Sequence, residues 1–329
     1  MSAIDVQQIK AEVDKCAETM ERIRLEVRKV LVGQDELLSR LLTALLTGGH
    51  ILLEGVPGLA KTTAIKALAA AVQTRFQRIQ FTPDLLPADL IGTLIYNPRE
   101  GSFTTKKGPI FANLILADEI NRAPSKVQSA LLEAMQERQV TIGDETFKLP
   151  APFLVLATQN PIEQEGTYHL PEAQLDRFMY ELRIGYPTVA EEEEIVSSTT
   201  GVQDHTVKPV LPADTLREMM RLVRRLPAPP ELVSYAVSLA RATRPDEPGA
   251  SAMVKKYISF GAGPRAGQYL VLGAKARAAM DGRTVPDLED VDAVAFSVLR
   301  HRVVLNFQAE AEGMGIEKIL ALGGRAKGK

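Results

Sequence analysis

The sequence predicts an α/β fold in which a parallel sheet is flanked by helices, followed by an all-helical domain. Three features of the 329-residue chain lead to this prediction. Short apolar runs alternate with helix-length segments as far as Pro187. A glycine-rich turn joins the first run to an Ala-rich segment, and after Pro187 only helical periodicity remains. We therefore expect two domains, 1–187 and 188–329.

The first 50 residues are predicted to form two helices. Residues 1–30 are charged, with apolar positions spaced as on one side of a helix. The next segment has two adjacent leucine rows, which predict a wide buried face, and it is expected to end at Gly48-Gly49. These rows are Leu37, Leu41, Leu45 and Leu38, Leu42, Leu46.

Five apolar segments have the length of strands, and helices are expected between them. The strands are predicted at Ile51–Leu53, Phe76–Phe81, Leu114–Ala117, Phe153–Ala157 and Phe178–Ile184, and the helices at Lys61–Val72 and Pro124–Arg138. Two hairpins, near Thr93–Lys106 and at Val140–Leu149, interrupt this alternation. Thr188 and Glu191 have the spacing of a capping box, which begins the helical domain.

The composition excludes several classes of protein. The chain is 45% hydrophobic and 24% charged, as in globular proteins, and its formal net charge of −2 argues against a general polyanion-binding surface. Cys16 is the only cysteine, so no intrachain disulfide forms. The N-terminus has no apolar secretory segment, and no run approaches the roughly 20 apolar residues that cross a bilayer. We expect a soluble, cytoplasmic protein.

The glycine-rich turn has the pattern of a phosphate-binding loop. It consists of Gly55, Val56, Pro57, Gly58, Leu59, Ala60, Lys61 and Thr62, with Thr63 next in the helix. Small residues let backbone N–H groups approach a triphosphate, and the helix N-terminus favours anions. Lys61 would hold the β- and γ-phosphates of ATP, and the Thr62 hydroxyl would bind Mg²⁺. Ala60 replaces the usual glycine, which is tolerable if its φ stays negative.

Polar residues end the third and fourth strands at the edge where this loop emerges. Asp118 is a candidate Mg²⁺ ligand, and Glu119 is a candidate base that polarises the attacking water. Asn160 follows the fourth strand and could sense the γ-phosphate, although an Asn-Pro turn would explain it as well.

Three arginines are candidates for stabilising charge during hydrolysis. Arg177 could reach the nucleotide of a neighbouring subunit, or pair locally with Glu172 or Asp176. Arg122 is a second candidate for the same role. Arg265 could reach the γ-phosphate from the helical domain, or be an ordinary surface residue. Such arginine fingers contribute about 10³–10⁵ in rate.

Taken in order, these segments resemble the AAA+ ATPases, and specifically their MoxR family. GVPGLAKT, LADEINRAP, ATQNP, LPEAQLDRF and GPRAGQYL resemble that family's Walker A, Walker B, sensor 1, arginine-finger and sensor 2 segments. The resemblance extends from about Val32 almost to the C-terminus. It implies that Val32, Gly33 and Gln34 lie by the adenine, that the hairpins are the helix-2 and pre-sensor-1 inserts, and that the helical domain is a lid.

The resemblance also implies a homo-oligomeric ring, commonly a hexamer, which acts like a chaperone on partner proteins. A von Willebrand A domain partner is expected as a separate protein, because this chain lacks that domain's Asp-x-Ser-x-Ser motif. Two alternatives remain. One is a nucleic-acid-linked motor, which the near-neutral charge and the lack of a recognisable DNA-binding domain disfavour. The other is a scaffold that binds ATP without turning it over, which Glu119 disfavours.

Overall fold

The computed structural model describes residues 3–55, 60–160, 167–200 and 206–324. The chain divides into two compact units. The sheet unit comprises Glu18–Phe178 and Leu182–Met220, and the helical unit comprises Met1–Ala17, Met179–Glu181 and Arg221–Lys329. Helices α1 (Ala3–Arg28) and α8 (Ala213–Arg225) and the sheet strand β9 (Tyr180–Ile184) each have residues in both units. The expected boundary near Pro187 stays a prediction.

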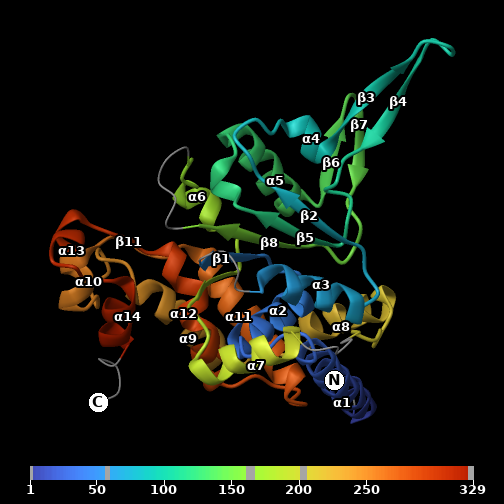
Figure 1. The fold of residues 1–329 in the computed structure, drawn as a ribbon. Coiled ribbons are helices and arrows are strands. Elements are labelled where there is room, and N and C mark those ends of the chain that lie inside the picture. Colours follow the sequence, from blue (N-terminus) through green and yellow to red (C-terminus); the bar gives the residue numbers. More distant parts are fainter. Residues whose placement is uncertain (1–2, 56–59, 161–166, 201–205, 325–329) are drawn as a thin grey trace. The chain divides into compact units, whose positions relative to one another are not determined.

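The sheet unit is built on five strands in the order β2-β5-β8-β1-β9 (Figure 1). They are β1 (Ile51–Gly55), β2 (Phe76–Gln80), β5 (Leu114–Asp118), β8 (Leu154–Gln159) and β9 (Tyr180–Ile184). β5 pairs with β2 and β8 in parallel, and β8 pairs with β1 in parallel. The predicted parallel sheet is therefore confirmed.

Both faces of this sheet are covered by helices, which explains why its central strands are continuously apolar. On one face, Ile115 and Val155 pack with Val127 and Leu131 of α5 (Ser125–Glu137). Helix α3 (Lys61–Ala71) contacts β2 and β5 and lies on the opposite side of the sheet from α5 (Figure 1). β2 is an edge strand, so its polar residues remain accessible.

Helix α2 (Asp35–Thr47) buries both predicted leucine rows. It ends at Gly48, whose φ of 69° lies in the left-handed region that glycine adopts easily, so the predicted end is confirmed. Helix α7 (Val189–Thr200) follows the predicted capping box. The Thr188 N–H donates to a Glu191 carboxylate oxygen at 2.8 Å, and the Glu191 N–H donates to the Thr188 hydroxyl at 3.4 Å.

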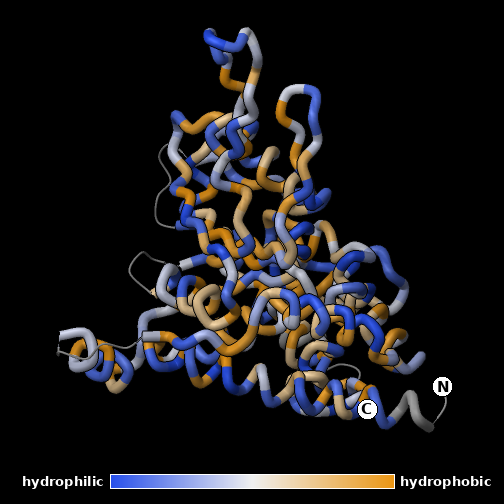
Figure 2. The backbone as a smooth tube through the Cα atoms, turned by 90° about the vertical axis from the view of Figure 1, so that its right-hand side faces the viewer, coloured by the Kyte–Doolittle hydropathy of each residue, from blue (hydrophilic) through white to orange (hydrophobic). Residues whose placement is uncertain are grey.

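Two antiparallel hairpins project from the sheet unit side by side (Figures 1 and 2). They are β3 (Gly92–Asn97) with β4 (Ser102–Lys107), and β6 (Gln139–Ile142) with β7 (Glu145–Lys148). Gly143 in the second turn has a φ of 63°, and a side chain there would come within 2.6 Å of Leu94. Glycine is therefore required both by the turn and by the neighbouring hairpin. Short elements complete the unit: α4 (Pro87–Ile91), η1 (Ile120–Arg122) and α6 (Glu172–Leu175).

The helical unit consists mainly of helices, with one short sheet that the sequence did not predict. Strands β10 (Ile258–Phe260) and β11 (Val304–Leu305) form an antiparallel pair, so the expectation of helices alone after Pro187 was incomplete. These strands are too short to show a period of two. The helices are α9 (Pro230–Ala242), α10 (Ala252–Tyr257), α11 (Pro264–Met280), α12 (Leu288–Leu299), η2 (Arg300–Arg302), α13 (Phe307–Ala311) and α14 (Ile316–Gly324).

Helix α11 packs between α9 and α12. Its Gly273 allows a close approach, because a side chain there would come within 3.1 Å of Val294 on α12. None of the helices in the described part of the chain combines the length and the apolar character that crossing a membrane requires.

A buried carboxylate holds the start of α12. Asp290 is only 2% exposed, and it accepts hydrogen bonds from Arg283 on both oxygens, at 2.6 and 2.7 Å. Asp290 and Asp287 also form a reciprocal capping box. Burial alone would raise the pKa of Asp290, but the hydrogen bonds from Arg283 and from the Asp287 N–H outweigh it and lower the pKa below its ordinary value.

We expect Asp290→Asn to lower the free energy of unfolding at pH 7 by about 2–3 kcal/mol, because a charged hydrogen-bond partner of Arg283 is lost in a buried site. Since the folded-state pKa is below the unfolded one, the carboxylate's stabilisation is complete above the unfolded pKa of about 4 and is lost as the pH falls through the folded pKa. Urea unfolding at several pH values measures both effects.

Asp281→Asn is the matched control, because Asp281 bonds the same arginine at 3.0 Å but is 54% exposed. It should cost less than about 1 kcal/mol. A cost of Asp290→Asn that does not change between pH 7 and pH 3 would contradict the assignment.

Candidate active site

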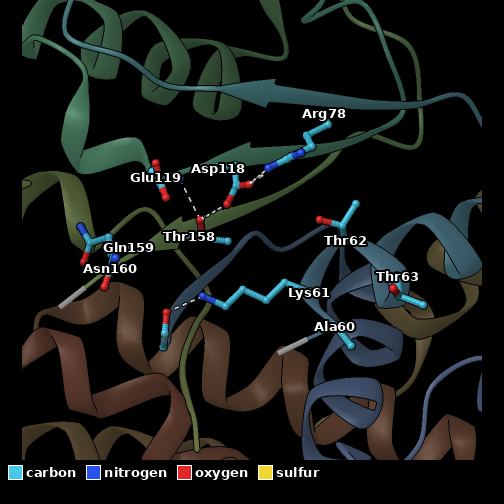
Figure 3. Close-up of a pocket in the computed structure, with 11 residues that line it drawn as sticks. Ala60, Lys61, Thr62, Thr63, Arg78, Asp118, Glu119, Thr158, Gln159 and Asn160 are labelled. Atoms are coloured by element: carbon cyan, nitrogen blue, oxygen red, sulfur yellow. Dashed lines mark hydrogen bonds and ion pairs between the residues drawn. The ribbon is translucent and has the colours of Figure 1, made fainter. Parts of the chain in front are cut away.

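A pocket of about 320 Å³ opens at the carboxyl-terminal edge of the parallel strands in the sheet unit (Figure 3). Ligands of open α/β sheets bind at this edge, because loops and helix N-termini converge there. The pocket is lined by Gly55, Ala60, Lys61, Thr62, Thr63, Arg78, Asp118, Glu119, Thr158, Gln159 and Asn160. Most of these lining residues are ones that the sequence analysis named as candidates.

The structure describes the two ends of the predicted phosphate-binding loop. Gly55 ends β1 and Lys61 begins α3, whereas Val56, Pro57, Gly58 and Leu59 lie outside the described residues. A side chain at Gly55 would come within 2.9 Å of the Ile184 carbonyl oxygen on β9, so the packing of these strands requires glycine.

Ala60 stands where the phosphate-loop pattern has a glycine, and its backbone is left-handed. Its φ is 54°, so the condition under which an alanine would be tolerated there, a negative φ, is not met. Ala60 is the N-cap of α3, and the chain enters the helix there from the left-handed region. For a residue with a Cβ this conformation costs about 1–2 kcal/mol. The substitution of glycine by alanine therefore leaves strain at the end of the loop.

Lys61 points into the pocket (Figure 3), where its ammonium group donates to the Gly55 carbonyl at 2.5 Å. Partial burial lowers the pKa of Lys61, while the Asp118 and Glu119 carboxylates act in the opposite direction. The ammonium group thus lies in a polar, partly enclosed site with two carboxylates nearby, and the acceptor of its hydrogen bond, the Gly55 carbonyl, is neutral.

Thr158 joins the two acids. Its hydroxyl donates to Asp118 Oδ1 at 2.6 Å and accepts the Glu119 backbone N–H at 2.8 Å. The parallel register explains this contact, because Ala117 pairs with Ala157, which places Asp118 beside Thr158. Thr158 is 1% exposed, so these hydrogen bonds are shielded from water.

The two carboxylates accept further hydrogen bonds from β2 and η1. Arg78 donates to Asp118 Oδ2 at 2.6 and 3.0 Å. Gln80 and Arg122 donate to Glu119 Oε2 at 2.7 and 3.0 Å. Glu119 itself has a φ of 57°, which turns the chain sharply away from β5 after Asp118.

The sequence did not identify Arg78, Gln80 and Thr158 as site residues. Arg78 and Gln80 project from β2, whose edge position in the sheet becomes known only from the strand order. The signal for Thr158 was present, since a threonine follows the apolar run of β8 at the functional edge. Asn160, which was predicted, lines the pocket and is 9% exposed.

The other predicted residues are not among the described residues that line the pocket. Val32, Gly33 and Gln34 lie between α1 and α2, where Gly33 and Gln34 have φ values of 63° and 57°. Arg177 is half-buried and follows α6. Arg265 lies in the first turn of α11, in the helical unit.

The comparisons with known proteins agree with this geometry. Residues 50–180 match the "ATPase family associated with various cellular activities (AAA)", and residues 250–321 match the "AAA lid domain". The chain is 48% identical to "Chaperone MoxR1" of Mycobacterium tuberculosis over 92% of this chain and 80% of that protein. It is 31% identical to "Protein MoxR" of Methylorubrum extorquens, over 86% of this chain and 87% of that protein.

A solved structure from Cytophaga hutchinsonii, described as a candidate ATPase, superposes with a TM-score of 0.91. It has 46% sequence identity and covers 98% of each chain. Fold and pocket together therefore define a protein of the AAA+ class, with a sheet-based nucleotide module and a helical lid domain. Within that class, the chain belongs to the MoxR family of ATPases.

We expect Ala60→Gly to be neutral or to stabilise the protein by up to about 1 kcal/mol, because it removes the left-handed strain at this position. Ala70→Gly is the matched control, since Ala70 is exposed within the last turn of α3 and the change should cost about 0.5–1 kcal/mol there. Urea unfolding compares the two variants. An equal loss of stability in both would contradict the strain at Ala60.

Thr158→Val keeps the shape of the side chain but removes the hydroxyl that joins Asp118 and the Glu119 N–H. We expect it to lower the free energy of unfolding by about 1–3 kcal/mol, because a buried N–H loses its acceptor. Thr158→Ser, which keeps the hydroxyl, should recover most of this loss. If the serine and valine variants are equally unstable, the hydroxyl is not what stabilises this site.

Proposed function

We propose that this chain binds ATP with Mg²⁺ and hydrolyses it within a homo-oligomeric ring, which we take to be a hexamer. Hydrolysis would drive chaperone-like remodelling, maturation, or metal or cofactor insertion of a partner protein. The observation that carries the proposal is the single pocket in which Lys61, Thr62, Asp118, Glu119 and Asn160 meet.

The charges in this pocket suit a triphosphate. Lys61 would exchange the Gly55 carbonyl for the β- and γ-phosphates, which removes the cost of a partly buried ammonium group. The backbone from Gly55 to Ala60 and the first residues of α3, Lys61 to Thr63, would surround the phosphates.

Mg²⁺ fits the oxygen donors present. The Thr62 hydroxyl and the Asp118 carboxylate line the same pocket, and hydroxyl and carboxylate oxygens are the ligands that this cation prefers. The described residues contain no cluster of three or more His, Cys, Asp and Glu side chains that could hold a metal by themselves. We therefore propose that Mg²⁺ would also be coordinated by water and by the substrate phosphates, and that it would neutralise the negative charge of those phosphates.

Glu119 would polarise the attacking water, with Gln80 and Arg122 orienting its carboxylate. Asn160 would act as sensor 1 beside it. We assign the trans-acting finger to Arg177 and leave Arg122 as the second candidate, although Arg122 pairs with Glu119 of its own chain here. Arg265 would act as sensor 2 from the lid, residues 188–329, and Val32, Gly33 and Gln34 would lie by the adenine.

Our proposal of a partner protein rests on the resemblance to the family. The name "Chaperone MoxR1" belongs to a relative, and we extend a chaperone-like role to this chain as a proposal. We propose a cytoplasmic location and a separate von Willebrand A domain partner. The alternative, a nucleic-acid-linked motor, shares the hairpin inserts, and the net charge of −2 disfavours it.

The proposal is tested by measuring ATPase rate against protein concentration, together with molar mass by light scattering. Wild-type specific activity should rise as the mass grows, and Arg177→Ala should assemble yet lose about 10³-fold in turnover. Glu119→Gln should bind nucleotide and lose turnover. Arg183→Ala is the control, since Arg183 is an exposed arginine on β9 that pairs with Glu54 at 2.7 Å.

The other readings give different results. Wild-type turnover no faster than that of Glu119→Gln would favour the ATP-binding scaffold. Activity independent of both concentration and Arg177 would mean that each site works alone. Stimulation by DNA that falls steeply with salt would favour the nucleic-acid motor.

A further inference from the structure

Helix α7 is only partly covered by the rest of the chain: Glu191, Ile195 and Ser198 on its inner side are half-buried, and the other residues are exposed. None of its 12 residues is buried, although most helices of this length depend on packing for stability. Val189 and Val196 are 75% and 55% exposed and lie seven residues apart on one face. Glu192 and Glu193 lie between them and line the same shallow hollow. The exposed face is therefore an apolar stripe with an acidic border.

The helical unit carries an apolar groove with a basic border. A groove of about 830 Å³ runs between α9 and α11 and has more apolar than polar lining. Val233 and Val237 on its α9 wall are 40% and 46% exposed. Gly267 on the α11 wall leaves room, since even an added side chain would meet only Val237, at an ordinary 3.9 Å.

Positive charge borders this groove. Arg224, Arg241 and Arg244 line it. Lys275 lies beside Arg224 and donates to its carbonyl oxygen at 3.4 Å, and burial together with the Arg224 charge lowers the pKa of Lys275. Glu247 pairs with Arg241 at 2.8 Å and lies 3.6 Å from Arg244, so one carboxylate serves two of these guanidinium groups.

The two surfaces match in shape, polarity and charge. An amphipathic helix that lays an apolar stripe into an apolar groove is a recurrent mode of recognition, and its flanking charges select the partner. Here the helix offers valines and glutamates, and the groove offers valines and arginines. Because the two surfaces are different patches of one chain, their contact between copies would be head-to-tail, and such a contact builds a ring when the rotation between successive copies closes.

We propose that α7 of one copy docks into the α9–α11 groove of the next copy. This interface rests on the proposed ring and adds a contact that does not involve the nucleotide. Glu191 belongs to the capping box of α7, and a side chain at Gly33 would come within 2.3 Å of the Glu191 carboxylate, so the segment before α2 lies against the first turn of the docking helix.

Cross-linking between copies tests the contact directly. One chain carries Val196→Cys, a second chain of different tag length carries Val237→Cys, and the two are mixed and treated with a bis-maleimide under assembly conditions. Cys16 is buried, which raises its pKa to about 11, so it should react slowly and can remain in place. We expect a covalent heterodimer in the mixture and little homodimer from either chain alone.

Three outcomes would overturn the proposal. A chain carrying both cysteines that yields only internally linked monomer would place α7 in the groove of its own copy. An assembled wild-type ring whose cysteine variants assemble but do not cross-link would disprove this interface and leave the ring intact. A wild type that stays monomeric in light scattering with ATP would remove both the ring and the interface.

A matched pair of single substitutions tests the charge complementarity. Glu193 lies on the docking face, whereas Glu194 does not line the hollow on that face and is exposed. Glu193→Lys should raise the protein concentration at which half the chains assemble by about tenfold, because attraction to the arginines becomes repulsion. Glu194→Lys, with the same change in net charge, should assemble like the wild type. Equal effects of the two variants would contradict the docking face.

Discussion

The parallel register of β1, β8 and β5 is the constraint on which the candidate site depends. Leu53 pairs with Thr158, and Ala117 pairs with Ala157, so the polar residues that follow each apolar run arrive at one level of one edge. A shift by one residue would turn Asp118 and Thr158 to opposite faces of the sheet, because side chains alternate along a strand. The helices on both faces make that shift costly, since they bury the alternate apolar residues.

The site is a set of charges that the protein partly satisfies by itself. Lys61 donates a hydrogen bond to a backbone carbonyl. Asp118 accepts hydrogen bonds from Thr158 and Arg78. Glu119 accepts hydrogen bonds from Gln80 and Arg122. Each of these contacts lies beside a position that a triphosphate, a cation or a water would occupy in the proposed reaction. Binding would thus exchange internal partners for ligand, and the free energy gained is the difference between the two sets of contacts.

Left-handed backbone occurs at the pocket, and exposed apolar side chains occur on a projecting hairpin. Ala60 and Glu119 both have left-handed backbone at the rim of the pocket, where the chain must turn within one residue of a strand or a helix. The hairpin β3–β4 projects from the sheet with Tyr96 and Phe103 exposed and in contact, at a ring-centroid distance of 5.2 Å. Together with α7, this hairpin presents apolar groups that the described part of the same chain does not bury.

The sequence by itself determined the five central strands, the helices between them, the two hairpins and the chemistry of the loop and strand ends. The apolar run Leu114–Ala117 has the length of a strand, and Lys61-Thr62 before an Ala-rich segment defines the loop. These signals are local. They depend on propensity, periodicity and spacing within about ten residues, which a single sequence displays fully.

Only the tertiary structure decided which side chains meet across those elements. The contacts of Arg78 with Asp118, and of Gln80 with Glu119, follow from β2 lying next to β5, and strand order is a long-range property that no local pattern encodes. The left-handed φ of Ala60 and the short pair of β10 and β11 likewise result from the geometry of neighbouring segments. The local sequence determines whether a segment forms a helix or a strand. Tertiary packing determines which elements lie next to each other, because the free energy of burying apolar surface depends on contacts between residues far apart in the chain.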